Sequence, residues 1–234
     1  MGRLFGTDGI RGVANENLSV DLALRAGQAA AEVLTEASNH KPLILIGKDT
    51  RISSDMFEAA LTAGICSVGG DVLLLGTVPT PAVAYLTKKL GADAGIMISA
   101  SHNPYEHNGI KIFNSEGFKL SDELEDRIEE RIKSGVKLKT HDGIGAVKRS
   151  DTAIQQYIDH VAGCIHSDLK GLRILVDCAN GSASVTAKSI FERFKSETEI
   201  LFDSPNGINI NSRCGSTHLE SLAKMVVAGG YDVG

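Results

Sequence analysis

Residues 98–113, ISASHNPYEHNGIKIF, place a run of polar and turn-forming residues between two runs rich in isoleucine. The overlapping stretch AGIMISAS, residues 94–101, predicts a buried strand with Ser101 at its carboxyl end. The stretch GIKIFN, residues 109–114, predicts the returning strand. Because open α/β sheets present ligands at the carboxyl ends of their strands, Ser101 is favourably placed for chemistry.

The loop between these strands carries turn signals and reactive groups. Pro104 prevents regular structure from continuing, and the Asn-Gly pair at 108–109 predicts a tight turn that requires positive φ. Lys111 should point away from the apolar face, toward a cleft or an anion, because burying an unpaired ammonium is unfavourable. Ser101, His102 and Lys111 can then converge, the hydroxyl carrying a phosphoryl group and the ammonium holding its charge or moving a proton. On turn chemistry alone, an ordinary surface turn is the stronger interpretation.

Strands and helices alternate along the rest of the chain. This alternation predicts layered α/β domains with a largely buried sheet. The polar segment 135–149 predicts a boundary, which gives domains at 1–150 and 151–234. The last residues read as the start of a further strand, so we expect the sequence to be a fragment. Helices are predicted at residues 18–38, 55–68, 81–91, 121–135, 151–166, 182–195 and 217–230, and further strands at 42–49, 71–76, 172–180 and 198–203.

Composition narrows the classes of function. Of 234 residues, 42% are hydrophobic and 23% are charged, which is enough to bury a core. The net charge of -5 gives no general attraction for nucleic acid or for an anionic membrane. The four cysteines are far apart, which argues against a zinc cluster or a disulfide framework, and no apolar run has membrane-spanning length. We expect a soluble cytoplasmic protein.

Of three other polar stretches, the first two have both a functional and a structural interpretation, and the third has a structural one only. FGTDGIRG, residues 5–12, presents Arg11 in a form suited to a phosphate or carboxylate, but a plain Asp-Gly hairpin explains it equally well. GKDTRISSDM, residues 47–56, offers Lys48 and Arg51 to an anion at a helix start, although capping explains most of it. ELEDRIEERIK, from residue 123, is typical of a solvated helix face.

Taken together, GTDGIRG, GKDTR and SASHNPYEHNGIK resemble the α-D-phosphohexomutase superfamily, above all its bacterial glucosamine-phosphate branch. The most specific part is Ser-His-Asn-Pro followed by Asn-Gly-x-Lys, and the likeness runs through the whole chain. The resemblance implies phosphohexomutase-type α/β domains with a mixed sheet between helices. Residues 1–150 would form a complete first domain with the phosphoserine loop, and 151–234 a truncated second domain without its metal loop.

The resemblance also implies an activity and roles for individual residues. The enzyme would interconvert glucosamine 6-phosphate and glucosamine 1-phosphate through a phosphoserine and a bisphosphate intermediate, in the supply of amino-sugar and cell-wall precursors. Ser101 would donate and accept the phosphoryl group, and Lys111 would be the general acid/base or the charge stabiliser. His102 would donate a hydrogen bond near the transferred group, and Arg11 would bind substrate.

A cofactor and an activator are implied as well. In the family, Mg²⁺ is held by the phosphate oxygens on the serine, here Ser101, and by aspartates of a D-G-D-x-D-R loop, which would lie beyond Gly234. A sugar bisphosphate would serve as activator and intermediate, this portion alone would be inactive, and a homodimer is compatible with the family. PNGININSRCGSTH, residues 205–218, favours the amino sugar. A phosphomannomutase or phosphoglucomutase, a non-catalytic sugar-phosphate binding module and a phosphatase are the alternatives.

Overall fold

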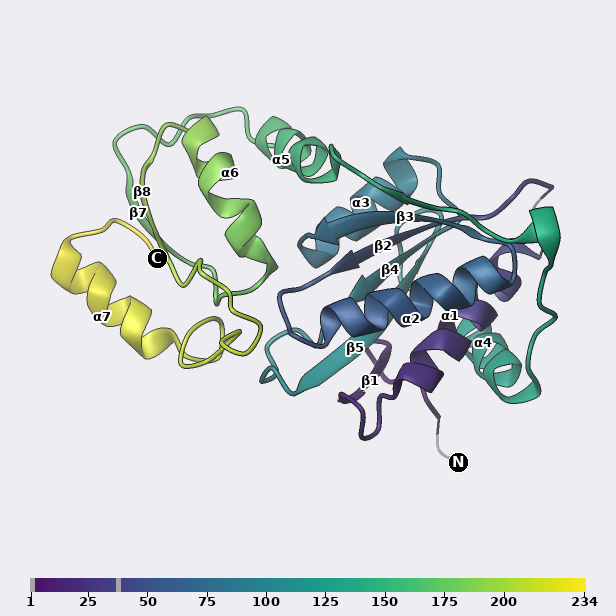
Figure 1. The fold of residues 1–234 in the computed structure, drawn as a ribbon. Coiled ribbons are helices and arrows are strands. Elements are labelled where there is room, and N and C mark those ends of the chain that lie inside the picture. The colour runs from purple at the N-terminus through teal and green to yellow at the C-terminus, as the bar shows by residue number, and fades with distance from the viewer. Residues whose placement is uncertain (1–2, 37–38) are drawn as a thin grey trace.

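The computed structural model describes residues 3–36 and 39–234, which form two groups of elements (Figure 1). The first group is built on a six-stranded sheet and the second on a two-stranded sheet. The first group contains β1 (Ile10–Val13), α1 (Val20–Thr35), β2 (Leu43–Lys48), α2 (Ser54–Ser67), β3 (Asp71–Thr77), α3 (Thr80–Lys89), β4 (Ala94–Ile98), β5 (His107–Asn114), α4 (Asp122–Ser134) and β6 (Val147–Arg149). The second contains α5 (Ala153–Gly163), β7 (Arg173–Asp177), α6 (Ala187–Arg193), β8 (Glu197–Leu201) and α7 (Leu219–Gly229).

The large sheet is mixed, as expected for an α/β fold of this type. Its strand order is β1-β5-β4-β2-β3-β6. Strands β4, β2, β3 and β6 are parallel to one another, whereas β5 is antiparallel to both β4 and β1. The small sheet pairs β7 with β8 in parallel. The predicted fold class, a mixed sheet between helices, is confirmed.

Helices cover both faces of the large sheet and bury two separate cores (Figure 1). Side chains alternate along each strand, so Ile96 and Ile98 of β4 pack with α1, α2 and α4, while Met97 between them packs with α3 and α5. The same alternation places Ile110 and Ile112 of β5 in the first core. The two faces of β5 are therefore distinct, and Lys111 lies on the face that is not filled by isoleucine.

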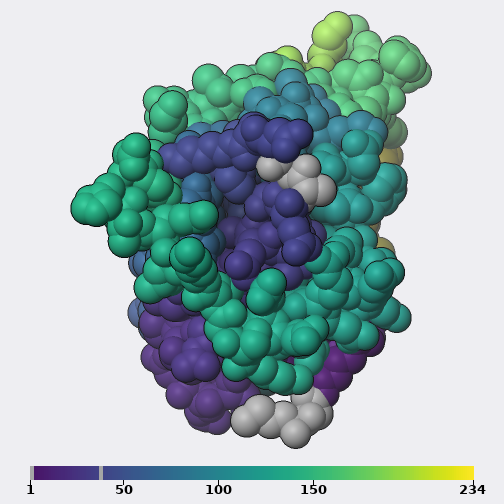
Figure 2. All heavy atoms as spheres, turned by 90° about the vertical axis from the view of Figure 1, so that its right-hand side faces the viewer, coloured from purple at the N-terminus to yellow at the C-terminus, as the bar shows by residue number. Residues whose placement is uncertain are grey.

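Two short strands were missed by the sequence analysis. Strand β1 begins inside the glycine-rich stretch 5–12, which was interpreted as a turn or hairpin, and it pairs with β5. Strand β6 lies inside the polar boundary segment 135–149 and pairs with β3. Figure 2 shows the end of the molecule at which this teal segment protrudes after α4. Both strands have little apolar character of their own, and pairing with an existing strand defines them.

The observed helices differ from the predicted ones by one to three residues at their ends, and one predicted helix is divided in two. Helix α1 ends at Thr35, and residues 37–38 of the predicted helix lie outside the described part of the chain. The predicted helix at 182–195 is broken into a 3₁₀ turn, Ser182–Val185, and helix α6. Thr186 between them is buried and has a non-helical φ of -126°. The chain therefore leaves helical geometry at Thr186 and resumes it in α6.

Helix α5 connects the two groups. It follows the predicted division at residue 150, yet Ala153 and Tyr157 pack into the core beneath α3. The ring of His160 also stacks on Tyr85 of α3, with 3.7 Å between ring centroids. The division into domains 1–150 and 151–234 stays a prediction. Among the described residues, no helix combines the length and the hydrophobicity that crossing a bilayer would require.

Candidate active site

Ser101 belongs to the loop between β4 and β5. This loop lies at the end of the large sheet that faces the second group (Figure 1). The residue is exposed, and its φ of 58° places it in the left-handed region, which residues other than glycine seldom occupy. Its main-chain N–H donates to Ser99 Oγ at 3.1 Å. Its neighbour His102 is exposed as well. The loop therefore presents Ser101 and His102, two of the three predicted catalytic residues, at the surface.

The predicted tight turn at residues 108–109 is wrong. Both residues lie inside β5, opposite β1, and the chain reverses earlier, at residues 101–106. The side chain of Asn108 is fully buried and donates to Ser53 Oγ at 2.9 Å and to Ser54 Oγ at 3.2 Å. These bonds to the start of α2 outweigh the local preference of an Asn-Gly pair for a turn.

Gly109 is required for close approach rather than for positive φ. A Cβ at this position would lie 2.7 Å from Ser99 O and 3.1 Å from Arg11 Cγ. Both distances are shorter than ordinary contacts. Only glycine therefore lets the Arg11 side chain cross β5 beside residues 99–106, the segment between β4 and β5 that we call the serine loop. The motif residue is therefore important for a reason that the sequence analysis did not identify.

Arg51 holds the serine loop from below, and its side chain is fully buried. Its Nε donates to Asp49 Oδ2 at 2.8 Å, so the charge is paired inside the protein. Asp49 Oδ1 in turn accepts from Ser54 Oγ at 2.9 Å. The guanidinium donates to four main-chain carbonyls, those of Ser101 (3.0 Å), Asn103 (2.9 Å), His107 (3.0 Å) and Pro104. One arginine thus fixes the loop along its length.

The structure changes the interpretation of the stretch at 47–56. Lys48 is not free to bind a ligand anion, because its ammonium lies 2.6 Å from the carboxylate of Asp55 and 2.6 Å from that of Glu58. Burial lowers the pKa of Lys48, but the hydrogen bonds to both carboxylates outweigh it and raise the pKa overall. Lys48 and Arg51 are both engaged within the protein. Arg51 could have been identified from its place in the sequence, because it lies two residues after Asp49, which ends the predicted buried strand 42–49.

Arg11 and Lys111 lie on one face of the sheet, together with Asp8. Arg11 stands opposite Gly109, and Lys111 is two residues further along β5, so their side chains share a face. Asp8 Oδ2 is 2.6 Å from Arg11 Nη2 and 4.0 Å from Lys111 Nζ. Ser99, opposite Gly109, belongs to the same face and connects it to the serine loop.

The electrostatics of this cluster favour an anion. Two cations share one carboxylate, and Arg11 Nε is buried without a hydrogen-bond partner among the described residues. The Lys111 side chain is 16% exposed, and burial lowers its pKa, with Asp8 partly opposing this. The cluster therefore has one more positive charge than negative charge, which favours a phosphate at this position. We therefore regard Arg11, Lys111 and Ser101 as one candidate site.

Comparison with known proteins places this fold and its loop in a family. The family described as phosphoglucomutase/phosphomannomutase, alpha/beta/alpha domain I, matches residues 2–139, more than half of the chain. The chain belongs to the phosphoglucomutase/phosphomannomutase family. A structure of a family member from Burkholderia thailandensis superposes with a TM-score of 0.84 at 25% identity, covering 98% of this chain and 51% of that one. Phosphoglucomutase parafusin from Paramecium, in its open form, shares the fold with a TM-score of 0.67 at 19% identity, covering 96% and 47%.

Curated relatives are more similar in sequence. The chain is 54% identical to the phosphoglucosamine mutase of Clostridium novyi over 237 residues, and 52% identical to that of Acetivibrio thermocellus. Each alignment covers 100% of this chain and 53% of the relative. The chain thus spans about half the length of the curated relatives it matches.

The described part of this phosphoglucomutase/phosphomannomutase family chain does not form a magnesium site by itself. No group of three or more His, Cys, Asp or Glu residues in residues 3–36 and 39–234 could hold a metal ion. A phosphate on Ser101 would offer oxygen ligands, but the described residues supply no cluster of carboxylates to complete the coordination of Mg²⁺. We therefore derive no catalytic step through a metal.

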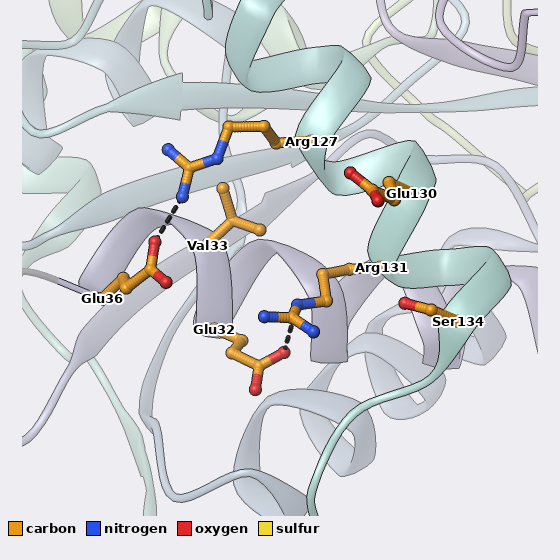
Figure 3. A pocket seen from close by; sticks show the side chains of 7 residues that line it. All are labelled: Glu32, Val33, Glu36, Arg127, Glu130, Arg131 and Ser134. Carbon is orange, nitrogen blue, oxygen red and sulfur yellow. Dashed lines mark hydrogen bonds and ion pairs between the residues drawn. The ribbon is translucent and has the colours of Figure 1, made fainter.

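A pocket of about 160 Å³ between α1 and α4 does not compete with this site (Figure 3). Arg131 of α4 approaches Glu32 of α1 at 3.0 Å, and Arg127 pairs with Glu36 in the same way. Figure 3 shows both pairs spanning the pocket, so four of its charged side chains are already paired with one another. None of the predicted catalytic or substrate-binding residues lines it.

Proposed function

We propose that the protein carries a phosphoryl group on Ser101 and interconverts glucosamine 6-phosphate and glucosamine 1-phosphate through a bisphosphate intermediate. The observation that supports this most directly is an exposed serine on a loop held by Arg51, connected through Ser99 to the sheet face on which two cations share one carboxylate. The curated relatives quoted above, at 54% and 52% identity, are phosphoglucosamine mutases, which favours the amino sugar over mannose or glucose. The activity is proposed for the protein at the length of those relatives.

The proposed reaction moves one phosphoryl group in each of two steps. In the first, a hydroxyl oxygen of the sugar phosphate attacks phosphorus, the bond from phosphorus to Ser101 Oγ breaks, and a sugar bisphosphate results. In the second, Ser101 Oγ attacks the other phosphate and the phosphoserine is restored. In each step the attacking hydroxyl loses its proton and the departing oxygen gains one, so charge and protons balance.

Lys111 and Arg11 have distinct proposed roles. Burial favours the neutral amine of Lys111, so this residue is suited to take the proton of an attacking hydroxyl and to return it to the departing oxygen. Arg11 stays charged and offers a fixed N–H to phosphate oxygens, which stabilises charge that moves during transfer. His102, exposed beside Ser101, is proposed as a further donor to the phosphoryl group.

The remaining proposals rest on the family resemblance, except that residence in the cytoplasm and the absence of binding to nucleic acid rest on composition and net charge. They are a Mg²⁺ requirement, activation by a sugar bisphosphate, residence in the cytoplasm, a homodimer, and an absence of binding to nucleic acid. Treatment with a chelator followed by addition of Mg²⁺ tests the first, and light scattering of the purified protein tests the homodimer.

Isomerisation and covalent phosphate together test the function. The wild-type protein at the length of its relatives should convert glucosamine 6-phosphate to the 1-phosphate, and intact-mass analysis should find one added phosphate. Ser101→Ala should remove that phosphate and lower the rate by at least about 1000-fold. Conversion that persists in Ser101→Ala would refute the assignment, and phosphate release without isomerised sugar would indicate a phosphatase.

A further inference from the structure

Asn211, in the segment between β8 and α7 of the second group, contacts the serine loop directly. Its Nδ2 donates to Ser101 O at 2.9 Å and to Asn103 O at 3.0 Å. Both acceptors are carbonyl oxygens, so only the amide nitrogen of Asn211 can face them. The same two carbonyls accept from Arg51 of the first group, at 3.0 and 2.9 Å. Each carbonyl oxygen has two lone pairs, and each is thus bound from both sides.

The backbone of Asn211 is itself fixed in the orientation that this contact needs. Its N–H donates to Ala179 O at 2.9 Å, and its φ of 58° is a left-handed conformation that asparagine tolerates better than most residues. Nearby, Ile52 N–H donates to Gly207 O at 2.9 Å, which ties the segment to the start of α2. The amide is therefore held in place before any substrate arrives.

We propose that Asn211 is a positioning residue for Ser101. The inference deepens the proposed function, because it assumes that Ser101 carries the phosphoryl group. An exposed serine in a left-handed conformation has few contacts of its own, and Arg51 restrains the loop only from the side of the large sheet. Asn211 closes the other side, so the second group sets the position of Ser101 Oγ without touching substrate.

Replacing the amide donor tests this assignment in the protein at the length of its relatives. Asn211→Asp keeps the shape of the side chain but turns a carboxylate oxygen toward two carbonyl oxygens, which should push the loop away. We expect kcat to fall by about 100-fold, since small misplacements of a reacting group have effects of that size. The KM for glucosamine 6-phosphate should change less than about threefold, because Asn211 does not contact the substrate in this scheme. When kcat is calculated for the folded fraction of the protein, a role in overall stability alone would not produce that split.

Asn209→Asp is the matched control. Asn209 Nδ2 donates to Ser204 O at 3.1 Å, within the same segment, so this variant loses an amide donor that does not reach the serine loop. Asn209→Asp should keep kcat within about threefold of wild type. Asn211→Gly retains the left-handed backbone and removes the donor, so it should also lower kcat if Asn211→Asp fails to fold. Normal kcat in Asn211→Gly, or equal losses in Asn211→Asp and Asn209→Asp, would overturn the proposal.

The two hypotheses fail in different ways. If Ser101 is not the phosphoryl carrier, Ser101→Ala retains conversion whatever Asn211→Asp does, and the proposed function fails. If Ser101→Ala is inactive and Asn211→Gly has normal kcat, the proposed function stands and the positioning role of Asn211 is wrong.

Discussion

Ser101 adopts a left-handed backbone conformation, which residues other than glycine seldom occupy. Glycine can occupy this region without the Cβ clash, so Ser101→Gly and Ser101→Ala should differ although both lack the hydroxyl. We expect the glycine variant to be more stable than the alanine variant by about 1 kcal/mol. Urea unfolding followed by circular dichroism measures the difference. Equal stabilities would mean that the loop relaxes to another conformation when the hydroxyl is lost.

Lys111 should leave a pH signature in stability. Burial lowers its pKa below the ordinary value of 10.5, so between the two values the unfolded chain binds more protons and stability rises with pH. Lys111→Met abolishes this titration. The stability of Lys111→Met relative to wild type should therefore be greatest near neutral pH and should decrease as pH approaches 10.5. Urea unfolding at several pH values tests this, with the exposed Lys88→Met as control. A difference independent of pH would contradict it.

At the scale of elements, helix α4 is more than a solvated surface helix. Its Glu125 and Glu129 are buried, contrary to the sequence interpretation. Glu129 Oε1 accepts from Leu4 N–H at 2.7 Å and from Phe5 N–H at 2.9 Å, and so anchors the chain that leads into the Arg11 loop. The charged spacing of the helix was correctly predicted, but its buried carboxylates satisfy main-chain groups of another segment.

Glu129 offers a matched pair of substitutions. Glu129→Ala leaves two N–H groups unsatisfied, one of them in the buried Phe5, which should cost about 1–3 kcal/mol. Glu129→Gln keeps the accepting oxygen and should cost less than half as much. Urea unfolding gives both values. If Gln is as harmful as Ala, the negative charge rather than the acceptor is what matters at this position.

For the molecule as a whole, part of the contact between the two groups lies in the segment that leads into α2. Thr50 Oγ1 donates to Asn180 O at 2.6 Å, and Ile52 N–H donates to Gly207 O at 2.9 Å. Thr50→Val keeps the shape and removes the hydroxyl, so it should speed hydrogen exchange at the Ile52 amide and cost about 1 kcal/mol. Thr50→Ser retains the hydroxyl and should exchange like wild type. Unchanged exchange in Thr50→Val would show that this bond does not hold the groups together.

The sequence by itself determined the strands and helices of both groups wherever apolar residues repeat with a clear period, because such periodicity is a local property. It also singled out Ser101, His102, Lys111 and Arg11, whose residue types carry chemistry, although their roles stay proposals. Strands β1 and β6 and the course of residues 108–109 depended on pairing with distant segments, so local preference gave the wrong answer there.

Only the tertiary structure decided what holds the serine loop. Arg51 reaches Ser101 across 50 positions, Asn211 across 110, and Glu129 reaches Phe5 across 124. No periodicity or turn rule relates residues so far apart, since each contact exists only after the sheet and both helical layers have packed. Buried donors and acceptors must form hydrogen bonds, and their partners are the groups that lie close to them in the packed structure. The partners of the loop therefore depend on the tertiary structure.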